Sequence, residues 1–178
     1  EETWELALER ATQAYSHHSK AIKNDERVAV INYVTTNDSD DRLRLYDPTA
    51  DWKQLGSYWV SHATKSDAGY SETLDELPFN QCANRFSNTS GSNLSSKGAF
   101  VTADAKGQSS YGRENLRLHG KDPTLNSNAH TRAIVFHQAL QDGKALGFSL
   151  GCPMLKPEDL DPVLDAIVGG ALVYVHHE

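Results

Sequence analysis

The feature that most constrains the fold is a series of short segments rich in β-branched and aromatic residues, separated by polar turns. They occupy residues 27–34, 42–46, 56–63, 97–104, 115–120, 132–138 and 171–177. Segments of this length and composition are typical of β-strands. The polar residues between the first two segments favour a hairpin loop, so the sequence predicts a fold built mainly from strands.

Two other segments carry apolar residues at helical spacing. Near the amino terminus, Trp4, Leu8, Ala11 and Tyr15 form an amphipathic stripe. Residues 156–170 have proline and acidic residues in the first turn, and glycines at their end. The order helix, many strands, helix, strand predicts an α+β, mainly β fold.

Length and composition restrict the classes of protein. At 178 residues the chain suits one domain, residues 1–178, with residues 1–20 as a helix packed on it. The formal charge of −7 argues against nucleic acid and anionic membranes as partners. No apolar run approaches the roughly 20 residues that span a bilayer, so we expect no membrane insertion. We expect a monomer.

The cysteines and histidines give no pattern of a metal site or a disulfide framework. Cys82 and Cys152 are the only two cysteines, and we expect both to be free thiols. The adjacent histidines at 17–18 and at 176–177 diverge on either a helix or a strand, so neither pair chelates by itself. We expect no metal and no organic cofactor.

A long polar stretch, residues 64–96, separates the third and fourth strand segments. It includes Phe79, Cys82 and Phe86, which need a place to pack. Loops of this length without regular structure are uncommon in compact domains and often form binding sites. The sequence therefore predicts a functional loop here.

The strongest chemical signal is HQALQDGKALGFSLGCP, residues 137–153. A cysteine thiol is largely protonated at neutral pH and needs a base, and His137 can fold back on Cys152 through the glycines between them. Gly151 would let the backbone approach a carbonyl, and the N–H groups of residues 150–152 would form an oxyanion hole. The alternative is a small buried thiol and a core histidine. Spacing alone leaves both interpretations open.

Several ordered segments resemble one family. RAIVFH followed by a glycine-containing loop and FSLGCP resembles the signature of L,D-transpeptidases of the YkuD type, and Gly-Cys-Pro resembles the murein L,D-transpeptidase catalytic domain branch. FSNTSGSNLSSKGAFVTAD, LRLHG, NSNAHTRAIVFH and GGALVYVHH resemble the same branch. The likeness extends from about Arg27 to the end of the chain.

The resemblance implies a β-sandwich or barrel with an amino-terminal helix and a helix after the catalytic cysteine. It implies a peptidoglycan L,D-transpeptidase in the bacterial envelope, periplasmic or secreted. Cys152 would form a thioester with a stem tetrapeptide, release D-alanine and pass the acyl group to an amine in a 3→3 cross-link. His137 would carry the protons, oriented by a backbone carbonyl such as that of Gln138.

Two alternatives stay open. One is an L,D-carboxypeptidase or murein hydrolase that uses the same Cys–His site. The other is a catalytically silent murein-binding domain, because Leu150 replaces a family histidine, and Pro153 and Met154 replace the apolar residue and the arginine or asparagine of many members.

These departures leave the carboxylate of the substrate without an obvious partner. A guanidinium fork binds a carboxylate at two points, so Arg132, Arg117 or Arg85 are the expected substitutes. The sequence does not choose among the three.

The remaining candidates each have two interpretations. Ser149 would either bond the thiolate or shape the turn. Ser87 and Asn88 would form a polar wall against substrate or a solvated loop, and His119 would line the cleft or end a surface strand. Leu150 is a candidate substrate contact. Trp59 and Tyr111 would face the cleft or the core.

Overall fold

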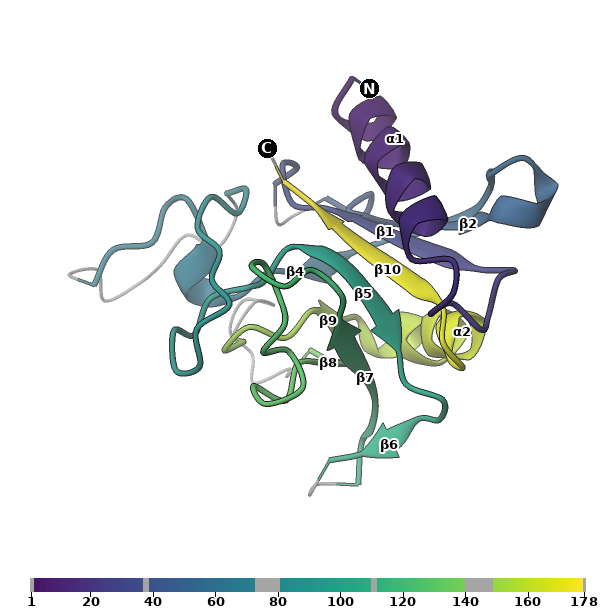
Figure 1. Ribbon diagram of the computed structural model, residues 1–178. Helices are drawn as coiled ribbons and strands as arrows, with labels where there is room; N and C mark the ends of the chain where they lie inside the picture. Colours follow the sequence, from purple (N-terminus) through teal and green to yellow (C-terminus); the bar gives the residue numbers. More distant parts are fainter. Residues whose placement is uncertain (1, 37–38, 73–80, 110–111, 140–148, 178) are drawn as a thin grey trace.

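The computed structural model describes residues 2–36, 39–72, 81–109, 112–139 and 149–177. In chain order its main elements are α1 (Glu2–His17), β1 (Val28–Asn32), β2 (Leu43–Asp47), β3 (Lys53–Tyr58), β4 (Val60–Ser61), β5 (Gly98–Thr102), β6 (Gly107–Gln108), β7 (Glu114–Gly120), β8 (Val135–Gln138), β9 (Met154–Leu155), α2 (Pro157–Ile167) and β10 (Leu172–His176) (Figure 1). The predicted mainly β, α+β fold is confirmed.

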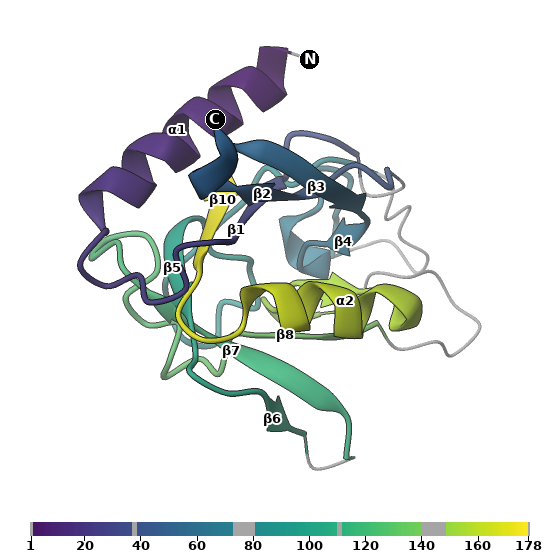
Figure 2. The ribbon, with the colours of Figure 1, turned by 90° about the vertical axis from the view of Figure 1, so that its right-hand side faces the viewer.

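The strands form one continuous path, β3-β2-β1-β10-β5-β7-β8-β9-β4, with β6 added to β7. Only Trp59 separates β3 and β4, which are the two ends of this path. The two strands therefore lie close together, as Figure 2 shows, and the sheet is nearly closed into a barrel.

The predicted strand at residues 56–63 is wrong as a single element. Tyr58, at the end of β3, pairs with Leu43 of β2, whereas Val60 of β4 pairs with Leu155 of β9. Trp59, between the two strands, is buried with Ala139 and Met154. A change of partner strand leaves no trace in the pattern of apolar residues, which is why the sequence showed one strand.

The predicted strand at residues 132–138 is shortened to Val135–Gln138. Ala133 has a φ of 55°, a left-handed conformation that an extended strand does not contain. The strands β6 and β9, of two residues each, were not predicted because so short a segment carries no periodic signal.

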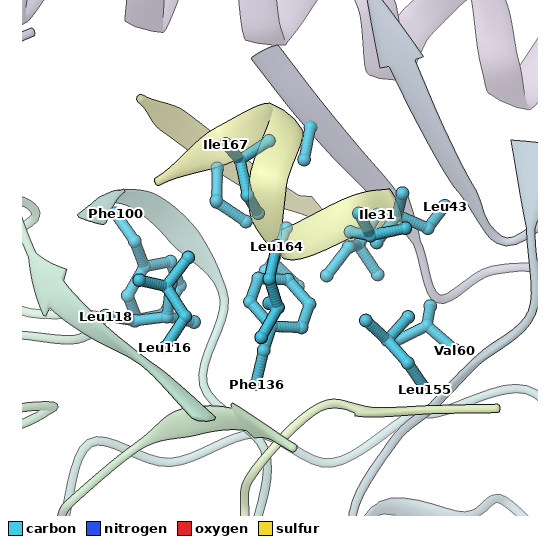
Figure 3. Close-up of a cluster of buried hydrophobic side chains, with 14 of the residues drawn as sticks. Ile31, Leu43, Val60, Phe100, Leu116, Leu118, Phe136, Leu155, Leu164 and Ile167 are labelled. Carbon is cyan, nitrogen blue, oxygen red and sulfur yellow. The ribbon is translucent and has the colours of Figure 1, made fainter. Parts of the chain in front are cut away.

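Helix α2 fills the space enclosed by the curved sheet. Its predicted apolar residues Leu160, Val163, Leu164 and Ile167 are all buried. Figure 3 shows Leu164 and Ile167 among side chains from several strands, including Phe136 of β8. This packing fixes the inner face of β8.

Helix α1 covers the opposite face of the sheet, over β1 and β10 (Figure 1). From its predicted stripe, Trp4 and Ala11 are buried against Val28, Val30 and Leu172. No helix in the described part of the chain is long and apolar enough to cross a membrane.

A buried polar network holds the segment after β4. Arg42 is 0% exposed, and its Nη1 donates to the carbonyl of Val60 at 2.6 Å. Its Nη2 lies 2.8 Å from Nδ1 of His62, whose Nε2 lies 3.1 Å from Asp67 Oδ2. Arginine only donates, so Nδ1 accepts and the proton of a neutral His62 points at Asp67. Burial and the charge of Arg42 lower the pKa of His62, against the raising effect of Asp67.

We predict that Arg42→Met lowers the free energy of unfolding by about 3 kcal/mol, because it leaves the Val60 carbonyl and His62 without a buried donor. Urea unfolding followed by circular dichroism measures this change. The matched control is Arg10→Met on the exposed side of α1, which should shift stability by less than about 0.5 kcal/mol. Equal stability of the two variants would contradict the prediction.

Candidate active site

His137 lies on β8, between β7 and β9. It pairs with Asn115 of β7 in antiparallel register and with Met154 of β9 in parallel register. Its neighbour Phe136 is buried in the core, and side chains alternate along a strand. His137 therefore projects from the face of β8 that is turned away from the core.

Cys152 lies beside the same strand. It precedes Met154, the partner of His137, by two residues, and the carbonyl of Pro153 accepts a hydrogen bond from His137 N at 3.4 Å. The Cys152 thiol donates to the carbonyl of Ala133 at 3.6 Å, which places the sulfur next to the start of β8. Cys152 therefore lies beside the strand that carries His137, with its side chain partly packed against the main core cluster.

The ring of His137 is held in one tautomer. Its Nδ1 lies 2.9 Å from the carbonyl oxygen of Gln138, which is the carbonyl expected from the sequence. A carbonyl only accepts, so Nδ1 carries the proton and Nε2 carries the lone pair. His137 is therefore prepared to accept a proton at Nε2.

The electrostatics favour a neutral thiol and a neutral imidazole. Burial raises the pKa of Cys152, and the Val135 N–H and the charge of Arg132 oppose this effect. Burial lowers the pKa of His137; the Gln138 carbonyl opposes this, while the charge of Arg113 adds to it. The proton therefore stays on sulfur at neutral pH until a reaction removes it.

The turn that carries Cys152 depends on Gly151. Its φ is 127°, which side chains rarely adopt, and a Cβ there would lie 2.9 Å from the Leu94 carbonyl oxygen and 3.0 Å from Nη2 of Arg132. Ser149 is buried: its carbonyl accepts from Thr64 N at 3.3 Å, and its hydroxyl from Gly151 N at 3.4 Å. Both hydrogen bonds join Ser149 to backbone N–H groups, as expected if Ser149 shapes the turn.

Arg132 binds the loop that faces this turn. Its Nη1 donates to the Ser87 carbonyl at 2.8 Å and to Ser96 Oγ at 2.6 Å. Its Nη2 donates to the Leu94 carbonyl at 2.6 Å and to Ser92 Oγ at 3.3 Å. Both terminal nitrogens are thus committed to residues 87–96, and their charge lies near the Cys152 sulfur.

The comparisons with known proteins identify the family of the chain. The sequence matches the family described as L,D-transpeptidase catalytic domain over residues 2–176. The chain belongs to this family. A search of curated proteins found no match.

Two solved structures resemble the fold of this L,D-transpeptidase-family domain. The helical cell shape determining protein Pgp2 from Campylobacter jejuni has a TM-score of 0.54 and 13% identity, over 94% of this chain and 56% of that chain. An L,D-transpeptidase from Mycobacterium smegmatis has a TM-score of 0.48 and 14% identity, over 85% and 59%. The chain thus spans less than two thirds of either structure. The likeness to Pgp2 confirms the predicted fold.

Two other predicted site residues of this L,D-transpeptidase-family domain are Asn88, in the 87–96 loop, and Leu150, in the Cys152 turn. Asn88 accepts from Asn128 N at 2.8 Å and donates to Ser127 at 2.9 Å, so the 87–96 loop is docked on the segment before β8. Leu150, next to Gly151, is 73% exposed.

Two of the predicted arginines bind backbone carbonyls. Nη1 of Arg117 donates to the carbonyl of His130 at 3.2 Å, and Nη2 of Arg85 to that of Tyr70 at 3.0 Å. His119 stacks on His130 and lines a different pocket from His137, one of about 250 Å³. Trp59 is buried, and Tyr111 and Phe79 lie outside the described residues.

A pocket of about 500 Å³ opens beside His137. It is lined by Ser109, Arg113, Glu114, Asn115, Val135, His137 and Gln138. The sequence analysis missed the lining residues from β7 and the turn before it. Only the pairing of Asn115 with His137 reveals them, and strand pairing is not readable from one sequence.

We predict that Arg132→Met lowers the free energy of unfolding by about 2–4 kcal/mol, because the carbonyls of Ser87 and Leu94 lose a charged donor. Chemical denaturation measures the change. Arg132→Lys keeps the charge but has no fork, so its loss should be intermediate. Wild-type stability in Arg132→Met would show that the loop does not depend on these bonds.

We predict that alkylation of Cys152 by iodoacetamide becomes faster as pH rises, with a midpoint above the usual value for a free thiol, because burial raises the pKa of Cys152. The measurement uses Cys82→Ser, which leaves Cys152 as the one cysteine of the chain. Rates are taken from about pH 6 to about pH 10. A rate that is already at its plateau near neutral pH would indicate a preformed thiolate and contradict the neutral pair.

Proposed function

We propose that residues 1–178 are one catalytic domain that acts as a peptidoglycan L,D-transpeptidase in the bacterial cell envelope, periplasmic or secreted, with Cys152 as nucleophile and His137 as base. The observation that carries the proposal is the match to the L,D-transpeptidase catalytic domain family over residues 2–176. The pairing of His137 with Met154 adds support, because it brings the segment that follows Cys152 beside His137. The Gln138 carbonyl adds support by leaving Nε2 of His137 unprotonated.

In the first half of the reaction the donor is a stem tetrapeptide. Cys152 Sγ attacks the carbonyl carbon between diaminopimelate and D-alanine while His137 Nε2 takes the thiol proton. The C–N bond then breaks, and the imidazolium returns that proton to the amine of the leaving D-alanine. The product is a thioester between Cys152 and the shortened peptide.

In the second half an acceptor amine attacks the thioester. His137 removes a proton from the amine as the C–N bond forms, the C–S bond breaks, and the proton returns to the sulfur. The result is a 3→3 cross-link and a regenerated thiol. If water replaces the amine, the same steps give an L,D-carboxypeptidase.

Backbone and apolar groups of the Cys152 turn support the tetrahedral intermediate in this proposal. The N–H groups of Leu150 and Cys152 are the donors for its oxyanion, since Gly151 N already donates to Ser149 Oγ. Such donors are typically worth about 10²–10³ in rate. The exposed side chain of Leu150 offers apolar contact to the peptide beside the nucleophile.

We predict that a carbapenem forms one stable adduct, carried by Cys152, which intact mass spectrometry detects as a mass increase of one inhibitor molecule. A strained β-lactam carbonyl acylates the thiol by the same chemistry as the donor carbonyl. Cys82→Ala is the matched control and should keep the adduct, whereas Cys152→Ala should lose it. The absence of an adduct in the wild type, or its persistence in Cys152→Ala, counts against the proposal.

Muropeptide analysis after incubation with disaccharide tetrapeptides then separates the reactions. A cross-linked dimer together with released D-alanine indicates the transferase, whereas tripeptide alone indicates the carboxypeptidase. Unchanged muropeptides and an unmodified Cys152 would favour the silent murein-binding domain.

A further inference from the structure

The pocket beside His137 contains a cation that the reaction as described does not use. Arg113 immediately precedes β7, and its carbonyl accepts a hydrogen bond from Ser109 N at 2.8 Å. Its side chain is exposed and lines the pocket together with His137. The residue before β7 therefore contributes a guanidinium to the wall of the pocket that His137 lines.

Among the described residues, no side chain or carbonyl binds the guanidinium of Arg113. The carboxylate in the same wall, Glu114, lies 3.2 Å from Lys106 Nζ, which also contacts Asp165 at 2.8 Å. Lys106 thus offsets the charge of Glu114. The guanidinium of Arg113 is therefore suited to bind an anionic ligand at two points.

The arginines proposed from the sequence are less suited to this task. Arg132 uses both terminal nitrogens on the 87–96 loop, Arg117 bonds to His130, and Arg85 bonds to Tyr70. None of the three lines the pocket of His137. Arg113 does, and its charge lowers the pKa of His137, as expected for a cation near the ring.

The chemistry of the substrate determines which anion belongs there. In the proposed reaction His137 protonates the amine of leaving D-alanine and later deprotonates an amine of the acceptor. In D-alanine, and at the end of the diaminopimelate side chain, this amine and a carboxylate share one carbon. An amine at His137 therefore brings a carboxylate into the same pocket in both halves of the reaction.

We propose that Arg113 binds the α-carboxylate next to the reacting amine, first on the leaving D-alanine and then on the acceptor. This inference rests on the proposed function and names its specificity: the pocket selects α-amino acid ends over simple amines and amides. Arg113 supplies the carboxylate partner that the Pro153-Met154 sequence does not.

The test compares two donors, a tetrapeptide that ends in D-alanine and the same peptide that ends in D-alaninamide. We predict that the wild type has a kcat/KM roughly 10- to 100-fold higher for the carboxylate, the effect of charged hydrogen bonds. Arg113→Gln should lose this preference, mainly through a higher KM for the donor that ends in D-alanine. Arg113→Lys should recover part of the preference, because it restores the charge without the fork.

Arg10→Gln on α1 is the control for the loss of one positive charge and should keep the full preference. Thermal unfolding of each variant checks that the fold is intact. A preference in Arg113→Gln equal to that of the wild type, or no preference in the wild type, overturns the assignment.

Failure of the inference is distinguishable from failure of the proposed function. If Cys152 still forms the carbapenem adduct and the donor is consumed, but Arg113→Gln discriminates as the wild type does, only the role of Arg113 is wrong. If neither donor is consumed and Cys152 forms no adduct, the proposed function fails and the role of Arg113 fails with it.

Discussion

The guanidinium of Arg132 is the contact on which the site depends most. It binds four oxygens of residues 87–96. Its Nη2 and the Leu94 carbonyl that it binds also occupy the space of a side chain at residue 151, where a φ of 127° already favours glycine. One cation thus fixes the polar loop and limits the path of the chain toward the nucleophile. Its charge also opposes the effect of burial on the pKa of Cys152. Loop order and thiol chemistry are coupled through this side chain.

Burial shifts the pKa values of Cys152 and His137 in opposite directions. It raises the pKa of the thiol and lowers that of the imidazole, so an ion pair between them is disfavoured. A neutral thiol is protected from unselective oxidation and alkylation. In the proposed reaction it becomes a nucleophile only when a carbonyl is near enough for attack and proton transfer to proceed together, which ties reactivity to substrate binding.

The sequence predicted the strand segments and both helices well, because burial leaves a local periodic pattern in segments such as α2. It also paired His137 with Cys152 through a family resemblance, whereas spacing left the pair undecided. It did not reveal the break at Trp59, the short strand β9 or the pocket at Arg113. Each of these depends on which strands pair, and pairing between segments far apart in the chain has no local signature.

The position of β10 has a consequence for the order of folding. This strand lies between β1 and β5, and its register joins Leu172 to Val28 across most of the chain. Contacts between residues so far apart form late and slow the folding of β-rich domains. During synthesis β1 must wait for β10, which is translated much later, and until then β1 and β5 have exposed edges. Strand β10 therefore sets a condition for completing the sheet, because β1 and β5 become neighbours of a common strand only in a chain translated through β10.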